Sequence, residues 1–486
     1  MMKWKNKVIL AVFAVIVCLI YVLLPYPTVT LTDAKETAID QYMLSKLEEL
    51  RIPGAAIGIV DQGEITMKGY GVRNANGDEM TPQTEILLGS TTKSITAVAI
   101  MQLAEQGKLG LDDAIIKYLP EFSFDQKEDS RAITIRQLLN QTSGIAGPTG
   151  GSDFLDGEQT ADEFVSRLKY EALSMNPGEE YQYAEANYII LGQIVEAASG
   201  QTYASYVEEH IFTPLHMTHS FTTKEAAQES GLSDGYRTWF GFPVKVELPH
   251  PKQYLSASGL YSNVEDMVHY MSMYLQDGSY EGRAILSEAS LKEITKPAVL
   301  LKHPVGYSYG MGWFVGDGVI THDGRPTNYY SAIIMNQETD RGIVLIANTN
   351  NRLITAEYMM PMVFEMMNAL EGKANTGASF GFRQMYRLLN VILLLMFALP
   401  LYRFILFIRK KNQKSLIRTI IPELLNFSVV LSILLWLLNS YGVHLRIAFL
   451  GQPDIVLVIV ATLVLILINI VVKLLISLKK ATAEKQ

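Results

Sequence analysis

Four long apolar stretches limit what this chain can fold into, because the first can enter a lipid bilayer as a signal or anchor and each of the other three is long enough to cross it. One lies near the N-terminus, at Val8–Leu24, and three lie near the end, at Leu388–Ile408, Thr419–Ser440 and Ile455–Leu478. A helix of about 20 apolar residues spans the ~30 Å hydrocarbon core of a bilayer. The composition agrees, since only 19% of the 486 residues are charged, whereas soluble domains carry about a quarter. The sequence therefore predicts a membrane protein with a large polar domain between its apolar ends.

The first apolar stretch has the features of an export signal. Lysines precede it, and Pro25 and Pro27 follow it where a cleavage site of the A-x-A kind would be expected. A basic start followed by an apolar core is typical of such signals. Because the cleavage site is missing, we favour an uncleaved anchor.

Basic residues predict the orientation of the chain in the membrane. They crowd the segment 409–418 and the tail 479–486 and precede the first apolar stretch, whereas Arg446 is the only one between the last two stretches. Basic loops stay on the cytoplasmic side. We therefore expect both termini in the cytoplasm of a multi-pass protein of the cell membrane, with the domain from about Thr30 to Met385 on the extracytoplasmic face.

Composition excludes several kinds of chemistry. The chain has 41 basic and 49 acidic residues, a net charge of -8, so we expect no nucleic-acid partner. Its single cysteine, Cys18, lies within the first apolar stretch, which excludes disulfides and cysteine chemistry in the polar domain. The histidines lack a metal-ligand spacing such as H-E-x-x-H, so we expect no metal and no other cofactor.

The polar domain reads as a mixed α/β (α+β) fold. Short β-like runs such as Ala55–Val60 and Ile343–Ala347 alternate with helical patterns. We expect five parts in chain order: a signal anchor at 1–29, the mixed domain at 30–370, a linker at 371–387, three transmembrane helices at 388–478 and a cytoplasmic tail at 479–486.

Three charged residues, Arg403, Glu423 and Lys473, lie inside or near the ends of the predicted membrane helices. We interpret them as side chains that reach toward the interface or pair between helices. The alternative is a polar path for a lipid-linked substrate.

An S-x-x-K motif at Ser90 and Lys93 is the strongest indication of chemistry. On a helix this spacing puts both side chains on one face. The lysine can remove the serine proton only when it is neutral, which requires its pKa to fall by about 3 units. Further matches begin at Ser166 and Ser477, but only Ser90 is followed by an apolar helical pattern, at 95–103.

More motifs follow in a consistent order along the domain. They are Leu88–Ser94, Leu138–Gly144, Pro177-Gly178, Leu191–Glu196, Pro214–Met217, Tyr309–Trp313 and His322–Gly324. Together they resemble the class C β-lactamase and penicillin-binding serine hydrolase family over about residues 39–350. With its apolar ends, the chain resembles the membrane-anchored type, represented by a staphylococcal FmtA-like protein and a colibactin-maturing peptidase. The resemblance implies a β-lactamase/transpeptidase-like domain, an antiparallel sheet flanked by helices.

The resemblance also implies a catalytic set. Ser90 would be the nucleophile, and Lys93 and a tyrosine would move protons. The family's tyrosine lies in a Y-x-N motif, which Tyr261–Asn263 matches literally, in a stretch that resembles a structural part of the family. Tyr183 departs from the motif, because Glu185 stands where Asn is usual. It nevertheless follows Pro177-Gly178 and precedes Leu191–Glu196, as the family's tyrosine does. We therefore assign the catalytic tyrosine to Tyr183.

Residues near His322 complete the site that the resemblance implies. The H-x-G sequence stands where relatives carry K-T-G or H-x-G, so we expect His322 to contact substrate or to aid electrostatically, not to act as the base. Gly324 would let a substrate backbone approach closely. The backbone N–H groups of Ser90 and Arg325 would form the oxyanion hole. We place Asn328 among the substrate-binding residues as well.

Glu185 departs from the asparagine that is usual in the family. Paired with Lys93, its carboxylate would raise the lysine's pKa and oppose its role as a base. We therefore expect Glu185 to face the substrate, where it would repel the carboxylate of a β-lactam and attract a protonated amine. The alternative is a side chain turned outward to solvent.

The resemblance implies a serine hydrolase that forms an acyl-enzyme with D-amino-acid-containing peptides, amides or esters. Its partners would be this small substrate and the lipid bilayer. The alternatives are a D-alanyl esterase or carboxypeptidase that acts on cell-wall polymers, and a non-catalytic penicillin-binding or sensor protein. A true β-lactamase is disfavoured, because a secreted resistance enzyme needs no three-helix tail.

Overall fold

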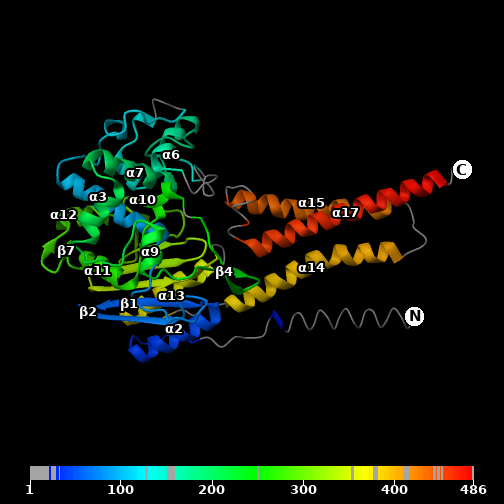
Figure 1. The fold of residues 1–486 in the computed structure, drawn as a ribbon, viewed down its shortest axis with the longest axis horizontal. Coiled ribbons are helices and arrows are strands. Elements are labelled where there is room, and N and C mark those ends of the chain that lie inside the picture. The colour runs from blue at the N-terminus through cyan, green and yellow to red at the C-terminus, as the bar shows by residue number, and fades with distance from the viewer. Residues whose placement is uncertain are drawn as a thin grey trace. The chain divides into compact units, whose positions relative to one another are not determined.

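The chain folds into two compact units, which we describe separately (Figure 1). One comprises residues 28–238 and 242–377, and the other residues 1–27, 239–241 and 378–486. The computed structural model describes residues 21–22, 29–31, 33–125, 130–147, 149, 159–249, 251–351, 355–375, 381–409, 416–441, 445, 449 and 452–483. The predicted N-terminal anchor lies almost entirely outside these residues, so it stays a prediction.

The larger unit is built on an eight-stranded antiparallel sheet in the order β2-β1-β14-β13-β12-β11-β10-β9. Strand β1, from the start of the unit, pairs with β14, from near its end, and Ala55 lies opposite Ala347. The two runs that were predicted to be strands are therefore neighbours in the sheet. The strands are β1 (Gly54–Asp61), β2 (Glu64–Gly71), β9 (Val299–Leu300), β10 (Ser308–Tyr309), β11 (Phe314–Gly316), β12 (Val319–Gly324), β13 (Tyr330–Asn336) and β14 (Arg341–Ala347).

Helices cover both faces of this sheet (Figure 1). Helix α11 (Val264–Leu275) packs on one face, so closely that a Cβ on Gly342 would lie 2.5 Å from the Met271 sulfur. Helices α13 (Thr355–Leu370) and α2 (Glu36–Leu50) pack on the other face and against each other. The prediction of an antiparallel sheet flanked by helices in an α/β (α+β) domain is confirmed.

A helical region beside the sheet surrounds α3 (Thr92–Glu105). Nearly all of α3 is buried, which fits a helix with apolar side chains on every side. The predicted helix after Ser90 is confirmed, and it ends before Gly107, whose φ is +69°. Helices α7 (Glu185–Ser199), α8 (Tyr203–Val207), α10 (Leu255–Ser258) and α12 (Glu288–Ile294) contact α3. The other short helices described in this unit are α5 (Ile135–Leu139), α6 (Ala161–Arg167) and α9 (Lys224–Ser230).

Short elements connect these layers. The short strands are β3 (Ile86–Leu87), β4 (Tyr236–Trp239), β5 (Phe242–Lys245), β6 (Tyr261–Ser262), β7 (Ser279–Tyr280), β8 (Arg283–Ala284) and β15 (Thr349–Asn350). The single-turn helices are η1 (Gly89–Thr91), η2 (Ile115–Lys117), η4 (Leu168–Tyr170), η5 (Glu208–Phe212) and η6 (Lys252–Tyr254).

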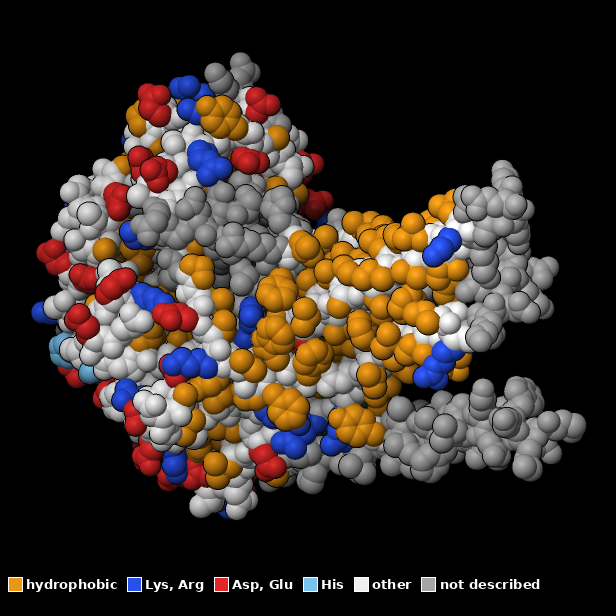
Figure 2. Space-filling model, turned by 45° about the vertical axis from the view of Figure 1, so that its right-hand side comes forward, with side chains coloured by type: hydrophobic (Ala, Val, Ile, Leu, Met, Phe, Trp, Pro, Cys, Tyr) orange, Lys and Arg blue, Asp and Glu red, His pale blue; other side chains and the backbone are white. Residues whose placement is uncertain are grey.

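The part of the smaller unit that the structure describes contains three long helices, α14 (Phe382–Arg409), α15 (Leu416–Tyr441) and α17 (Pro453–Ala483). Each is long and apolar enough to cross a membrane. Helix α17 packs against both α14 and α15, and apolar side chains cover much of the surface that Figure 2 shows. The sequence predicted residues 382–387 to be part of a linker. They instead form the first turns of α14, which begins at Phe382, before the apolar stretch that starts at Leu388.

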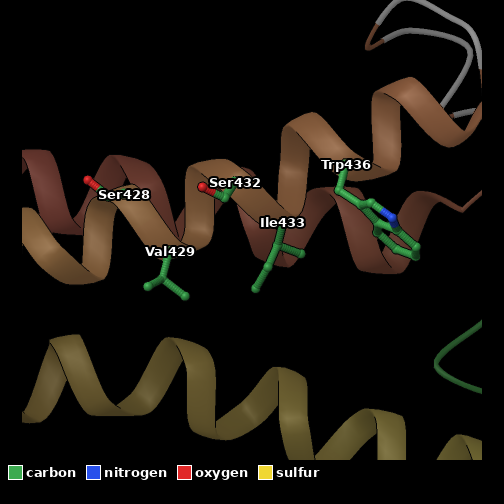
Figure 3. Close-up of a pocket in the computed structure, with 5 residues that line it drawn as sticks. All are labelled: Ser428, Val429, Ser432, Ile433 and Trp436. Atoms are coloured by element: carbon green, nitrogen blue, oxygen red, sulfur yellow. The ribbon is translucent and has the colours of Figure 1, made fainter.

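A shallow hollow lies along α15 (Figure 3). Val429 and Ile433 line it and point toward the ribbon of α14, with Ser428, Ser432 and Trp436 along the same helix. Because these side chains are apolar or weakly polar and none is a base, the hollow is not a candidate for a serine hydrolase site.

Candidate active site

A glycine brings two chain segments together at Ser90. Gly89 has φ +62°, and a Cβ there would lie 2.5 Å from Cδ of Pro326 and 3.2 Å from the backbone nitrogen of Arg325. A side chain at this position would therefore be strained and would also collide with the segment after β12. The glycine lets the Arg325 backbone lie beside the turn that carries Ser90.

Lys93 is fully buried one turn further along, and its ammonium has three acceptors. Its Nζ donates to Ser90 Oγ at 3.2 Å, to Glu185 Oε2 at 2.6 Å and to the carbonyl oxygen of Ala257 at 3.0 Å. A lysine ammonium has three donors, so this set satisfies it completely. The contact with Ala257 has no sequence signal, because it is made by a backbone carbonyl from a distant helix.

Two opposing effects act on the pKa of Lys93. Burial lowers the pKa of Lys93, because the apolar interior disfavours the ammonium. The charge of Glu185 and its hydrogen bond raise the same pKa, but burial is the larger effect, so the pKa of Lys93 is lowered overall. The neighbour that was predicted to oppose a base role for Lys93 is therefore in direct contact with it.

Glu185 bridges the nucleophile and the lysine. It is the first residue of α7, and Ser90 Oγ donates to its Oε1 at 3.4 Å while Lys93 holds its Oε2. The prediction that Glu185 faces the substrate instead of Lys93 is wrong, as is the alternative that it turns outward. A buried ammonium needs a counter-charge, and Glu185 supplies it with a side chain that is only 24% exposed.

Tyr183 lies beside the same group. Its ring centroid is 4.9 Å from Lys93 Nζ, and its ring makes an edge contact with Tyr309 at 6.4 Å. Burial and the charge of Glu185 raise the pKa of Tyr183 well above its usual value, and a hydrogen bond with Ser90 opposes this. The phenol is therefore protonated at neutral pH and can act as a donor.

The literal Y-x-N match has a structural role. Tyr261 lies in β6, which pairs with β3, and it is opposite Leu87. The Asn263 side chain caps α11 by accepting the backbone N–H of Asp266 at 2.8 Å. The structure therefore brings Tyr183, and not this motif, next to Ser90 and Lys93.

The segment that carries Tyr183 and Glu185 is held by side chains from the Leu138–Gly144 motif. Gln141 Oε1 accepts the backbone N–H of Ala184 at 2.9 Å and also a donor from Asn187. Ser143 Oγ donates to Asn187 Oδ1 at 2.6 Å. In the sequence this motif indicated only the family resemblance. The structure shows that it also positions the turn before α7.

His322 is buried in β12, and its ring packs against the ring of Tyr309 with centroids 6.2 Å apart. Its Nδ1 hydrogen-bonds the carbonyl oxygen of Asp323 at 2.8 Å, and its Nε2 is 3.5 Å from the Tyr309 hydroxyl. Burial lowers the pKa of His322 to about 4. The imidazole is therefore neutral at pH 7, and its hydrogen-bond partners are protein groups.

Gly324 is required by the protein's own backbone. A Cβ there would lie 1.7 Å from the carbonyl oxygen of Leu88 and 2.5 Å from Ser331 Oγ. Its small size therefore lets β12 approach the turn before Ser90, a structural reason that differs from the predicted approach of a substrate.

Arg325 and Asn328 differ in where they lie relative to Ser90. The Arg325 backbone nitrogen lies beside Gly89, and its side chain pairs with Asp323. The Asn328 amide instead donates to the Val246 carbonyl oxygen at 3.4 Å. The side chain of Asn328 is thus held by the loop after β5, and its assignment to the substrate site stays a prediction.

Comparison with known proteins gives one family over most of the chain. The family model described as Beta-lactamase matches residues 39–358. Protein flp of Staphylococcus aureus (strain COL) is 30% identical over 384 residues, which cover 77% of this chain and 74% of that protein. PbpX of Bacillus subtilis (strain 168) is 29% identical over 314 residues, which cover 64% of this chain and 74% of that protein.

A solved structure gives the same result. The octameric penicillin-binding protein homologue from Pyrococcus abyssi matches with a TM-score of 0.61 and 26% identity, over 69% of this chain and 77% of that chain. The region matched by the family model contains Ser90, Lys93, Tyr183 and Glu185. The resemblance inferred from the motifs is confirmed.

Proposed function

Because the chain belongs to the beta-lactamase family, we propose that it is a serine hydrolase that forms an acyl-enzyme on Ser90. The observation that carries the proposal is the 3.2 Å contact between Lys93 Nζ and Ser90 Oγ, with Tyr183 and Glu185 beside it. A serine hydroxyl is a poor nucleophile until a neighbouring group takes its proton. In this site two titratable side chains, Lys93 and Glu185, lie within hydrogen-bond distance of Ser90 Oγ.

The proposed reaction has two halves. Ser90 Oγ attacks a carbonyl carbon, and the backbone N–H groups of Ser90 and Arg325 stabilise the negative oxygen that forms. The protonated Tyr183 is placed to donate a proton when the leaving group departs. Water then attacks the acyl-enzyme and releases the acid, and the same side chains accept the proton of the water and return it to Ser90.

We propose as substrates peptides, amides or esters that contain a D-amino acid, outside the cytoplasm. The domain would be attached to the cell membrane through α14, α15 and α17, which are long and apolar enough to span it. The support for this substrate class is the resemblance to membrane-anchored family members, and a panel of D-amino-acid amides, esters and β-lactams would test it. A cell-surface hydrolase gains from such anchoring, because it meets substrates at the membrane face.

Covalent labelling of the full-length protein in detergent tests the proposed function. A fluorophosphonate probe and a fluorescent penicillin should label the wild type, and Ser90→Ala should lose the label with an unchanged circular dichroism spectrum. Ser166→Ala is the matched control, since Ser166 begins another S-x-x-K and its hydroxyl donates to the carbonyl oxygen of Glu163. A folded wild type that takes neither probe and hydrolyses nothing in the panel would favour a non-catalytic binding or sensor protein.

A further inference from the structure

We propose that Glu185, and not Lys93, accepts the proton of Ser90, and that Lys93 stays an ammonium that stabilises the serine oxygen. The inference rests on the proposed function, because it assumes that Ser90 is acylated. It assigns Glu185 a catalytic role, since its carboxylate contacts the reacting hydroxyl.

The direction of the hydrogen bonds is the first argument. Each of the three Nζ donors of Lys93 has its own acceptor, and one of these is the Ser90 oxygen. As an ammonium, Lys93 uses its three N–H groups on these oxygens and has no lone pair to receive the serine proton. With Lys93 in this state, the hydroxyl proton points to another acceptor.

Glu185 is the acceptor that the geometry provides. Its Oε1 lies 3.4 Å from Ser90 Oγ, and its Oε2 is held by Lys93. Tyr183 is also near Ser90, but burial keeps its phenol protonated, so its oxygen carries no negative charge with which to take the serine proton. Catalytic hydrogen bonds are often long before substrate binds and tighten in the complex, so 3.4 Å is compatible with proton transfer.

Electrostatics gives the second argument. A neutral lysine at pH 7 requires its pKa to fall by about 3 units. Burial acts in that direction and lowers the pKa of Lys93 overall, while the carboxylate of Glu185 at 2.6 Å opposes this fall and stabilises the ammonium. Removing the carboxylate would therefore favour a neutral lysine, so the two possible bases respond in opposite ways to loss of Glu185.

The acylation step balances with Glu185 as the base. The Ser90 O–H bond breaks, its proton moves to Glu185 Oε1, and the electron pair on Oγ forms the bond to the carbonyl carbon. The carbonyl π pair moves to its oxygen and returns as the bond to the leaving group breaks. The leaving group takes a proton from Tyr183, and the proton on Glu185 then moves to the Tyr183 phenolate, which restores both groups before water attacks.

The test compares labelling rates of Glu185→Gln and Glu185→Asn in the full-length protein. With Glu185 as the base, both variants should label at least about 100-fold more slowly than wild type, the usual size of a general-base effect. Glu185→Asp should recover part of the rate, because it retains a carboxylate. If Lys93 is the base, both neutral variants should label as fast as wild type or faster, and that result would overturn the inference.

A matched control separates this result from a general loss of structure. Glu180→Gln removes a surface carboxylate from the same segment, where Glu180 pairs with the exposed Lys302, and it should label at the wild-type rate. Thermal unfolding of each variant checks its fold. A wild type that never labels would count against the proposed function, whereas fast labelling of Glu185→Asn would count against the role of Glu185 alone.

Discussion

At the scale of single residues, the hydroxyl of Tyr183 is the simplest group to test. Tyr183→Phe keeps the ring packed against Tyr309 and removes the hydroxyl that hydrogen-bonds with Ser90. We expect covalent labelling to slow about 100-fold with little change in stability. Tyr261→Phe should keep the labelling rate, because Tyr261 lies in a structural strand. The opposite pattern, with Tyr261→Phe as the inactive variant, would show that the catalytic tyrosine is assigned incorrectly.

Gly324 makes a second prediction at this scale. Gly324→Ala would force a Cβ into the carbonyl of Leu88, so β12 must move away from the turn before Ser90. We expect a loss of about 1–3 kcal/mol of unfolding free energy together with a loss of labelling. Gly318, just before the other end of β12, has a positive φ, but a Cβ there would meet only Asn336 Nδ2, at an ordinary contact distance of 3.9 Å. The Gly318→Ala variant should be less stable by about 1–2 kcal/mol and still be labelled.

His322 makes stability depend on pH. Its pKa is about 4 in the folded protein and about 6.5 when unfolded, so the unfolded chain binds more protons between these values. Stability should therefore be complete above pH 6.5 and fall by up to about 3 kcal/mol as the pH drops to 4. Unfolding of wild type and His322→Gln at pH 7 and pH 5 isolates this contribution as the difference between them. An equal pH dependence in both proteins would exclude His322 as its source.

At the scale of elements, a buried ion pair joins α15 and α17. Lys473 Nζ lies 2.9 Å from Glu423 Oε1, and both side chains are less than 5% exposed. Pairing between helices, one of the two predicted roles, is therefore confirmed for these residues. Lys473→Met should destabilise the helices by about 3–5 kcal/mol, because it leaves a buried carboxylate without its partner. Adding Glu423→Gln should recover most of the thermal stability in detergent, and a double variant as weak as the single one would argue against this pairing.

At the scale of the whole molecule, the distribution of basic residues predicts an extracytoplasmic hydrolase domain. Lys and Arg cluster in the segment 409–418 and the tail 479–486, on the sides expected to stay in the cytoplasm. Protease added to intact spheroplasts should digest the domain, while an epitope tag at the C-terminus should survive until lysis. A domain that is digested only after lysis would reverse the orientation.

The features that the sequence determined by itself depend on residues that lie close together along the chain. The apolar stretches that form α14, α15 and α17 are encoded by local composition. The pairing of Ser90 with Lys93 follows from helix spacing, and the family follows from the order of the motifs. Only the tertiary structure decided that Glu185 contacts Lys93, that the Ala257 carbonyl is a further acceptor for the Lys93 ammonium, and that Asn328 hydrogen-bonds Val246. These contacts join segments that are far apart in the sequence, so they depend on how the helices and the sheet pack, which no local pattern encodes.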